Sequence, residues 1–154
     1  MIKYILLTTV VMTAGVFYMT TRKTLNVRNN NPLNIRKNER FEWLGEAGSS
    51  SGFVVFDSVE YGFRAAYRTM QTYKLKYGLD SIAGIINRWA PDFENPTNHY
   101  VDFVEQDTGI SRHAALTTEQ YAQVLLSMSY FEGAKGEDAY TLAQVKSGVA
   151  LAWS

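Results

Sequence analysis

The chain of 154 residues contains no cysteine. A disulfide framework, a thiolate zinc site and a cysteine nucleophile are therefore excluded, while the redox compartment stays open. Only two histidines are present, and His99 and His113 lack the helical spacing of a zinc enzyme. The sequence also lacks a phosphate-cradling glycine loop and a dinucleotide-binding fingerprint. We therefore expect neither a metal nor a cofactor.

The chain also lacks a net charge, because 15 Lys and Arg residues balance 15 Asp and Glu residues. This balance argues against a protein that coats nucleic acid, and we expect no nucleic-acid partner. The charges are unevenly distributed, since residues 1–38 carry six bases and no acid, which leaves 15 acids against 9 bases from Glu39 onward. A domain with this acidic excess would meet an anionic surface through local bases, for which Arg36, Lys37 and Arg40 are candidates.

The amino-terminal part contains an uncharged run of 18 residues at positions 4–21, flanked by Lys3 and by Arg22 with Lys23. As a helix this run would be about 27 Å long at about 1.5 Å per residue, close to the hydrocarbon core of a bilayer at about 30 Å. The sequence therefore predicts a transmembrane anchor over residues 1–23. A cleaved signal peptide and a buried core helix are the alternatives.

Residues 24–154 are predicted to form one mainly helical domain of the α+β class. The Asn-rich segment 24–38 reads as an arm and turn, and strands are expected at 33–36 and 53–56 with a Ser-rich turn at 49–52. Capping residues and helical spacing predict five helices. They run between Asp57 and Gly78, between Asp80 and Pro91, from Thr97 or Asn98 to Gly109, from Thr117 to near Gly133, and from Thr141 onward.

Glu132 is the most informative carboxylate in the sequence. It follows Met128 by four residues and Leu125 by seven, which puts it on the core-facing side of its helix just before Gly133. Burial raises the pKa of such a carboxyl group, and a glycosidase general acid needs that property. The alternative is a glutamate in the last helical turn that points to water.

An acidic loop offers further candidates, because Glu39, Glu42 and Glu46 cluster around Trp43 beside the expected hairpin. This loop would supply a second carboxylate or a ring that stacks on a sugar. The alternative is a solvated loop with one anchoring tryptophan.

Two other segments suggest sugar contacts. The amides of Asn29–Asn34 suit the acetamido and hydroxyl groups of a sugar, although such runs also satisfy their own backbone. Further along, Arg88 and Glu94 are expected to pair and brace a loop, and Tyr100 would project from the following helix into a cleft.

A series of short motifs extends from Arg28 to near the C-terminus: Arg28-Asn29-Asn30-Asn31-Pro32-x-Asn34-Ile35-Arg36, Trp43-x-Gly45, Phe53-x-x-Phe56, Tyr61-Gly62-x-Arg64-Ala65, Ile86-x-Arg88-Trp89-Ala90-Pro91, Glu94-Asn95-x-Thr97-x-x-Tyr100 and Glu132-Gly133. Taken together, these motifs resemble a family of small phage and prophage proteins described as virion lytic enzymes. That family looks related to the peptidoglycan-cutting enzyme of enveloped cystoviruses and to lysozyme-like lytic transglycosylases.

The resemblance implies a lysozyme-like domain over residues 24–154, circularly permuted because the hairpin precedes the catalytic helix, with Glu132 as general acid/base. The chain departs from the family pattern at Leu33, where a glycine is usual, and at Gly133-Ala134, where Asn-Gly is usual. Eight residues are predicted to bind the glycan: Asn31, Asn34, Trp43, Glu46, Tyr61, Trp89, Asn95 and Tyr100.

The function implied is that of a membrane-anchored phage enzyme that cleaves the glycosidic bond between N-acetylmuramic acid and N-acetylglucosamine. Without a clear second carboxylate, a lytic transglycosylase is favoured over a hydrolase. A non-enzymatic virion membrane protein that binds glycan and a peptidoglycan endopeptidase are the alternatives. The expected partners are peptidoglycan, the internal membrane of the virion or the inner membrane of the host, with the domain on the cell-wall side, and other virion membrane proteins.

Overall fold

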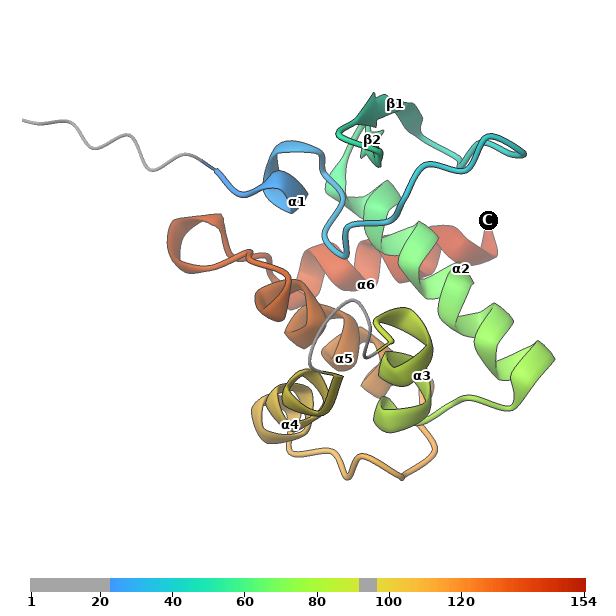
Figure 1. The fold of residues 1–154 in the computed structure, drawn as a ribbon, viewed down its shortest axis with the longest axis vertical. Coiled ribbons are helices and arrows are strands. Elements are labelled where there is room, and N and C mark those ends of the chain that lie inside the picture. Colours follow the sequence, from blue (N-terminus) through green and yellow to red (C-terminus); the bar gives the residue numbers. More distant parts are fainter. Residues whose placement is uncertain (1–22, 92–96) are drawn as a thin grey trace, which may run out of the picture.

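The computed structural model describes residues 23–91 and 97–154, which are mainly helical with one two-stranded sheet. This confirms the mainly helical part of the predicted fold class. The α-helices and strands are α1 (Leu25–Arg28), β1 (Glu46–Ser50), β2 (Phe53–Phe56), α2 (Val59–Tyr77), α3 (Ile82–Trp89), α4 (Thr97–Thr108), α5 (Thr118–Phe131) and α6 (Leu142–Ala150), as Figure 1 shows. Two 3₁₀ turns, η1 (Gly136–Asp138) and η2 (Leu151–Trp153), complete the described elements.

Local capping signals set several helix ends. The side chain of Thr117 accepts from the backbone N–H of Gln120, whose side chain accepts in return, and Thr141 and Gln144 repeat this capping box at α6. Gly78 ends α2 in the left-handed conformation, with φ of +66°. These three predicted signals are confirmed.

Two other predicted caps are wrong by one residue. Ser58, and not Asp57, precedes α2, and its side chain makes no capping hydrogen bond. Ser81, and not Asp80, caps α3, where its hydroxyl accepts from the N–H of Gly84. Serine and aspartate are both good N-caps, so adjacent residues of these types leave the boundary open by one position.

The sheet is an antiparallel hairpin of β1 and β2. The strand predicted at 33–36 forms only an isolated bridge, in which Arg36 pairs with Phe53, while the N–H of Val54 donates to the carbonyl of Ile35 at 2.9 Å. Of the stretch predicted as a turn, Ser51 and Gly52 form the turn between the strands, whereas Ser49 and Ser50 belong to β1. Backbone hydrogen bonds therefore hold the Asn-rich turn against β2.

Helix α2 lies at the centre of the core (Figure 1). It packs against α6, and the hairpin and the Asn-rich turn lie against its first turns. Two glycines allow these close approaches. A Cβ at Gly62 would lie 2.3 Å from the carbonyl oxygen of Asn30 and 2.6 Å from Cδ of Pro32, and one at Gly148 would lie 2.6 Å from the carbonyl oxygen of Glu60. The buried core includes Leu33, Phe63, Met70, Ile86, Val104, Leu125 and Val145.

The predicted transmembrane helix lies, apart from Lys23, outside the described residues. Within residues 23–91 and 97–154, no helix is long and apolar enough to cross a membrane. Even α2, the longest, carries Arg64, Arg68, Lys74 and Lys76, and charged side chains are costly inside a bilayer. The predicted fold class with its membrane-spanning helix, and the predicted single-pass membrane location, are therefore corrected: the described chain is a helical domain with a small hairpin.

Candidate functional site

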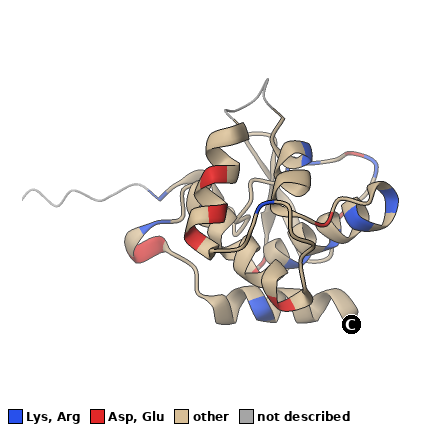
Figure 2. Ribbon diagram, turned by 90° about the horizontal axis from the view of Figure 1, so that it is seen from below, with Lys and Arg blue, Asp and Glu red and all other residues tan. Residues whose placement is uncertain are grey.

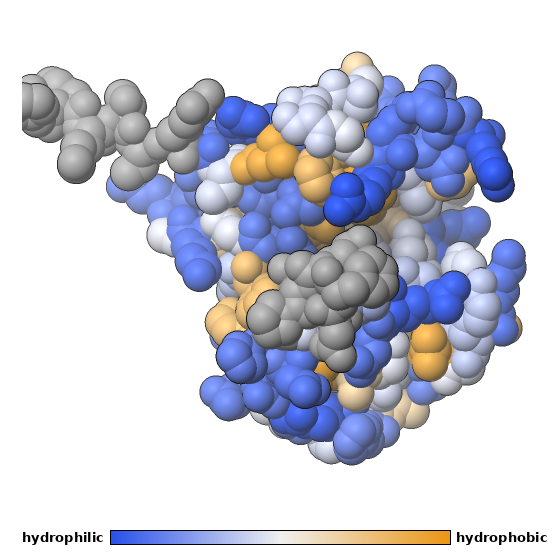
Figure 3. All heavy atoms as spheres, in the orientation of Figure 1, coloured by the Kyte–Doolittle hydropathy of each residue, from blue (hydrophilic) through white to orange (hydrophobic). Residues whose placement is uncertain are grey.

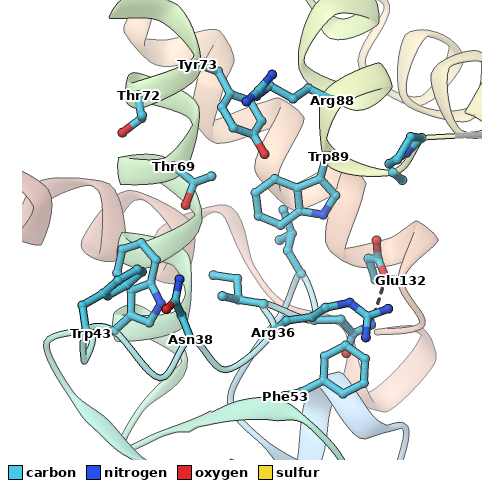
Figure 4. Close-up of a pocket in the computed structure, with 16 residues that line it drawn as sticks. Arg36, Asn38, Trp43, Phe53, Thr69, Thr72, Tyr73, Arg88, Trp89 and Glu132 are labelled. Carbon is cyan, nitrogen blue, oxygen red and sulfur yellow. Dashed lines mark hydrogen bonds between the residues drawn. The ribbon is translucent and has the colours of Figure 1, made fainter. Parts of the chain in front are cut away.

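A cavity of about 740 Å³ opens between the Asn-rich turn and hairpin on one side and helices α2 and α3 on the other, with the end of α5 at its edge. Figure 4 shows Glu132 at one side of this cavity and Trp89 between it and Arg88. On the face drawn in Figure 3, by contrast, the described surface is mostly hydrophilic, with only small apolar patches. Aromatic side chains make up much of the cavity wall: Phe41, Trp43, Phe53, Tyr73 and Trp89.

Glu132 is the C-cap residue of α5, and its backbone N–H donates to the carbonyl of Met128. Both of its carboxylate oxygens are held by side chains from distant parts of the chain. Nδ2 of Asn34 donates to Oε2 at 2.9 Å, and the hydroxyl of Tyr100 donates to Oε1 at 3.0 Å. The carboxyl group is therefore fixed in direction at the cavity wall.

Burial raises the pKa of Glu132 above its usual value, while the hydrogen bonds from Asn34 and Tyr100 act in the opposite direction. The partial burial predicted from the helical spacing is confirmed by the structure. A carboxyl group in this environment keeps its proton at a higher pH than an ordinary glutamate, which is the requirement for a general acid.

The raised pKa of Glu132 predicts a pH-dependent stability difference between the wild type and Glu132→Gln. The folded protein holds this proton more tightly than the unfolded chain, in which a glutamate titrates near about pH 4.3. As the pH rises from below that value through the raised pKa, the wild type loses the stability that this proton provides. Glu132→Gln has no such proton and does not lose it. Urea unfolding at several pH values is expected to show the variant gaining on the wild type as the pH rises. A constant difference would contradict the burial of this carboxyl group.

Tyr100 is fully buried and stacks on Phe131, with ring centroids 3.9 Å apart and planes 15° apart. Burial, together with the nearby carboxylate of Glu132, holds the pKa of its hydroxyl well above the usual value. Tyr100 therefore keeps its proton and donates to Glu132 from behind the cavity wall, with the carbonyl of Met128 as a second acceptor at 3.4 Å.

Neighbouring asparagines of the turn have different roles. Asn34 lines the cavity, and its φ of +51° directs its amide to the carboxylate. Asn31 is completely buried, and its side chain bonds to the backbone of Ile35 and Val54 only. Leu33, at the position where the resembling family has glycine, is buried in the core. Asn31 therefore shapes the turn, and Asn34 reaches the site.

The remaining predicted glycan-binding residues separate into two groups. Trp43 and Trp89 line the cavity with Glu132. Glu46 and Tyr61 do not: the carboxylate of Glu46 accepts from Nζ of Lys37 at 2.5 Å and from the N–H of Trp43, and the ring of Tyr61 packs over Gly45. Asn95 lies outside the described residues.

The sequence predicts no site role for Tyr73, and it predicts that Arg88 pairs with Glu94, which lies outside the described residues. Tyr73 and Arg88 both line the cavity. Tyr73 follows Phe63 and Tyr67 at helical spacing in α2, a pattern typical of a core, and no sequence signal distinguishes it from these two buried rings. Among the described residues, no group of three or more His, Asp or Glu side chains is arranged to hold a metal ion.

Comparison with known proteins identifies one informative relative. No protein-family model matches the chain. Protein P5 of Pseudoalteromonas phage PM2 is 42% identical to it over 126 residues, which cover 79% of this chain and 78% of Protein P5.

Proposed function

The chain belongs to the family of Protein P5 of Pseudoalteromonas phage PM2, and we propose that it is a phage virion protein that cuts peptidoglycan. The bond broken is the glycosidic bond from N-acetylmuramic acid to N-acetylglucosamine. One observation carries this proposal: a partly buried Glu132 with a raised pKa faces a cavity walled by aromatic rings. Rings of this kind are suited to stacking on sugars, and the carboxyl group is suited to donating a proton.

In the proposed reaction, protonated Glu132 gives its proton to the glycosidic oxygen as the bond from this oxygen to C1 of the muramyl ring breaks. The C6 hydroxyl of the same muramyl ring then attacks C1, and its proton passes to the carboxylate of Glu132. The products are a 1,6-anhydromuramyl end and a new N-acetylglucosamine end, and the acid is regenerated. Asn34 and Tyr100 stabilise the carboxylate in the interval.

Transglycosylation is preferred over hydrolysis because a hydrolase needs a second carboxylate within about 5–9.5 Å of the first, or an assisting substrate group. Glu132 is the only carboxylate among the described residues that line the cavity. The acids predicted as alternatives do not fill this role, since Glu46 is engaged by Lys37 and neither Glu39 nor Glu42 lines the cavity.

The test is the release of soluble fragments from purified Gram-negative cell walls by the full chain. The proposal expects soluble sugar-containing material that increases with time and enzyme concentration. If the walls bind the protein and stay intact, the chain is a non-enzymatic glycan-binding virion protein. If only peptide bonds are cut, it is an endopeptidase.

Tyr100→Phe is expected to lower kcat about tenfold and to move the alkaline limb of the pH profile to higher pH. The variant loses the 3.0 Å hydrogen bond that favours the charged form of Glu132, so the pKa of Glu132 rises further. Tyr130→Phe is the matched control, because its hydroxyl bonds to the carbonyl of Tyr140 instead. A pH profile of Tyr100→Phe that coincides with the wild type would contradict the assigned contact.

A further inference from the structure

Arg88 presents a fixed cation in the wall of the same cavity. It lies in the last turn of α3, and its guanidinium carbon is 3.6 Å from the ring centroid of Tyr77 and 5.2 Å from that of Tyr73. The ring of Tyr73 in turn meets Trp89 edge-on, with centroids 6.4 Å apart. Figure 4 shows Trp89 between Arg88 and Glu132. The cation and the carboxyl group therefore face one cavity from separate positions.

The surroundings of Arg88 favour an anion. Within residues 23–91 and 97–154, no carboxylate forms an ion pair with Arg88, whereas Arg112 is paired with both Asp102 and Glu105. Figure 2 shows acidic and basic residues spread over the whole ribbon and side by side in places. The nearby end of α2 carries Lys76 and Lys74, of which Lys74 is paired with Asp80. Nothing among the described cavity residues except Glu132 would repel a negative group.

We infer that Arg88 forms a subsite for a carboxylate of the substrate, an inference that rests on the proposed function. A guanidinium that lies over a tyrosine ring can still donate its N–H groups, and these donors match a carboxylate with two parallel hydrogen bonds. Peptidoglycan offers such a group in two places, on the lactyl group of muramic acid where the peptide stem is absent and on the peptide stem itself. The neighbouring Trp89 gives a sugar ring a surface between the carboxylate subsite and Glu132.

The experiment measures ligand affinity by calorimetry in the full chain carrying Glu132→Gln, so that no ligand is consumed. Three probes are compared: neutral chitotetraose, a stem-free tetrasaccharide of alternating N-acetylglucosamine and N-acetylmuramic acid, and the same tetrasaccharide with peptide stems. Arg88→Gln is added to this background, and Arg88→Lys tests the need for a planar group. Arg68→Gln is the matched control, because Arg68 is an exposed arginine of α2 that does not line the cavity.

Arg88→Gln is expected to weaken the binding of carboxylate-bearing probes about tenfold, the effect of losing one charge-assisted hydrogen-bonded pair. Chitotetraose is expected to change less than twofold, and Arg88→Lys to fall between. A loss already present with the stem-free probe assigns the lactyl carboxylate, and a loss seen only with the stems assigns the stem. Equal losses for all three probes, or none, would overturn the inference while the proposed function stands. If the Glu132→Gln variant binds none of the three probes, both the inference about Arg88 and the proposed function are contradicted.

Discussion

Replacing Glu132 by glutamine is expected to lower the rate of glycan release about a thousandfold, within the range of roughly 10²–10⁴ that general acid catalysis contributes. Glutamine has the same shape and fills the same space beside Asn34 and Tyr100, but it carries no proton of suitable acidity. The rate is measured as soluble sugar released from purified cell walls, with the unfolding midpoint measured in parallel.

Glu42→Gln is the matched control for this substitution, because it removes a carboxylate from the exposed acidic loop without touching the cavity. It is expected to stay within twofold of the wild type. Full activity of Glu132→Gln would contradict the assignment of the acid. Loss of activity in Glu42→Gln would point instead to a second carboxylate in the reaction and hence to a hydrolase.

Gly62→Ala is expected to destabilise the protein by about 2–3 kcal/mol, the upper range for overpacking a core, which corresponds to a fall of roughly 10 °C in Tm. A Cβ at this position would lie 2.3 Å from the carbonyl oxygen of Asn30, a backbone atom, and 2.6 Å from Cδ of Pro32. The Asn-rich turn must shift away from α2, and Asn34 shifts with it. Activity is therefore expected to fall together with stability.

Gly84→Ala is the matched control, since Gly84 is also a helical glycine and its Cβ would come no closer than 3.3 Å to any neighbour. Alanine is favoured over glycine in a helix by up to about 1 kcal/mol, so this variant is expected to be neutral or slightly stabilising. Thermal unfolding of both variants checks the comparison. Equal Tm values for the two would show that the turn does not rest on α2 as described.

Local signals in the sequence predict the helical part of the fold well. The capping boxes at Thr117 and Thr141 and the stop at Gly78 depend only on residues within one turn of each helix end. The sequence does not predict β1, because this strand depends on contacts outside its own segment. Its sequence from Glu46 to Ser50 has little preference for a strand, and it becomes one because it pairs with β2.

The site itself is predicted only in part, because its contacts join residues far apart in the chain. The helical spacing of Glu132 predicted its burial, but its hydrogen bond with Asn34 spans 98 positions. The different roles of Asn31 and Asn34 depend on the backbone conformation of the turn, which amide chemistry alone does not reveal. The stacking of Arg88 on Tyr77 depends on how α3 lies against α2, and no local pattern encodes that.

The most direct test of the central claim is the mass spectrum of the fragments that the full chain releases from Gram-negative peptidoglycan. Cleavage by Glu132 with attack of the muramyl C6 hydroxyl predicts fragments that end in 1,6-anhydro-N-acetylmuramic acid, lighter by one water than hydrolysed fragments. The same digest with Glu132→Gln is expected to lack them. Fragments with hydrolysed sugar ends would show that water, and not the C6 hydroxyl, attacks C1. Fragments with intact glycan chains and cut peptide stems, or no fragments at all, would contradict the account.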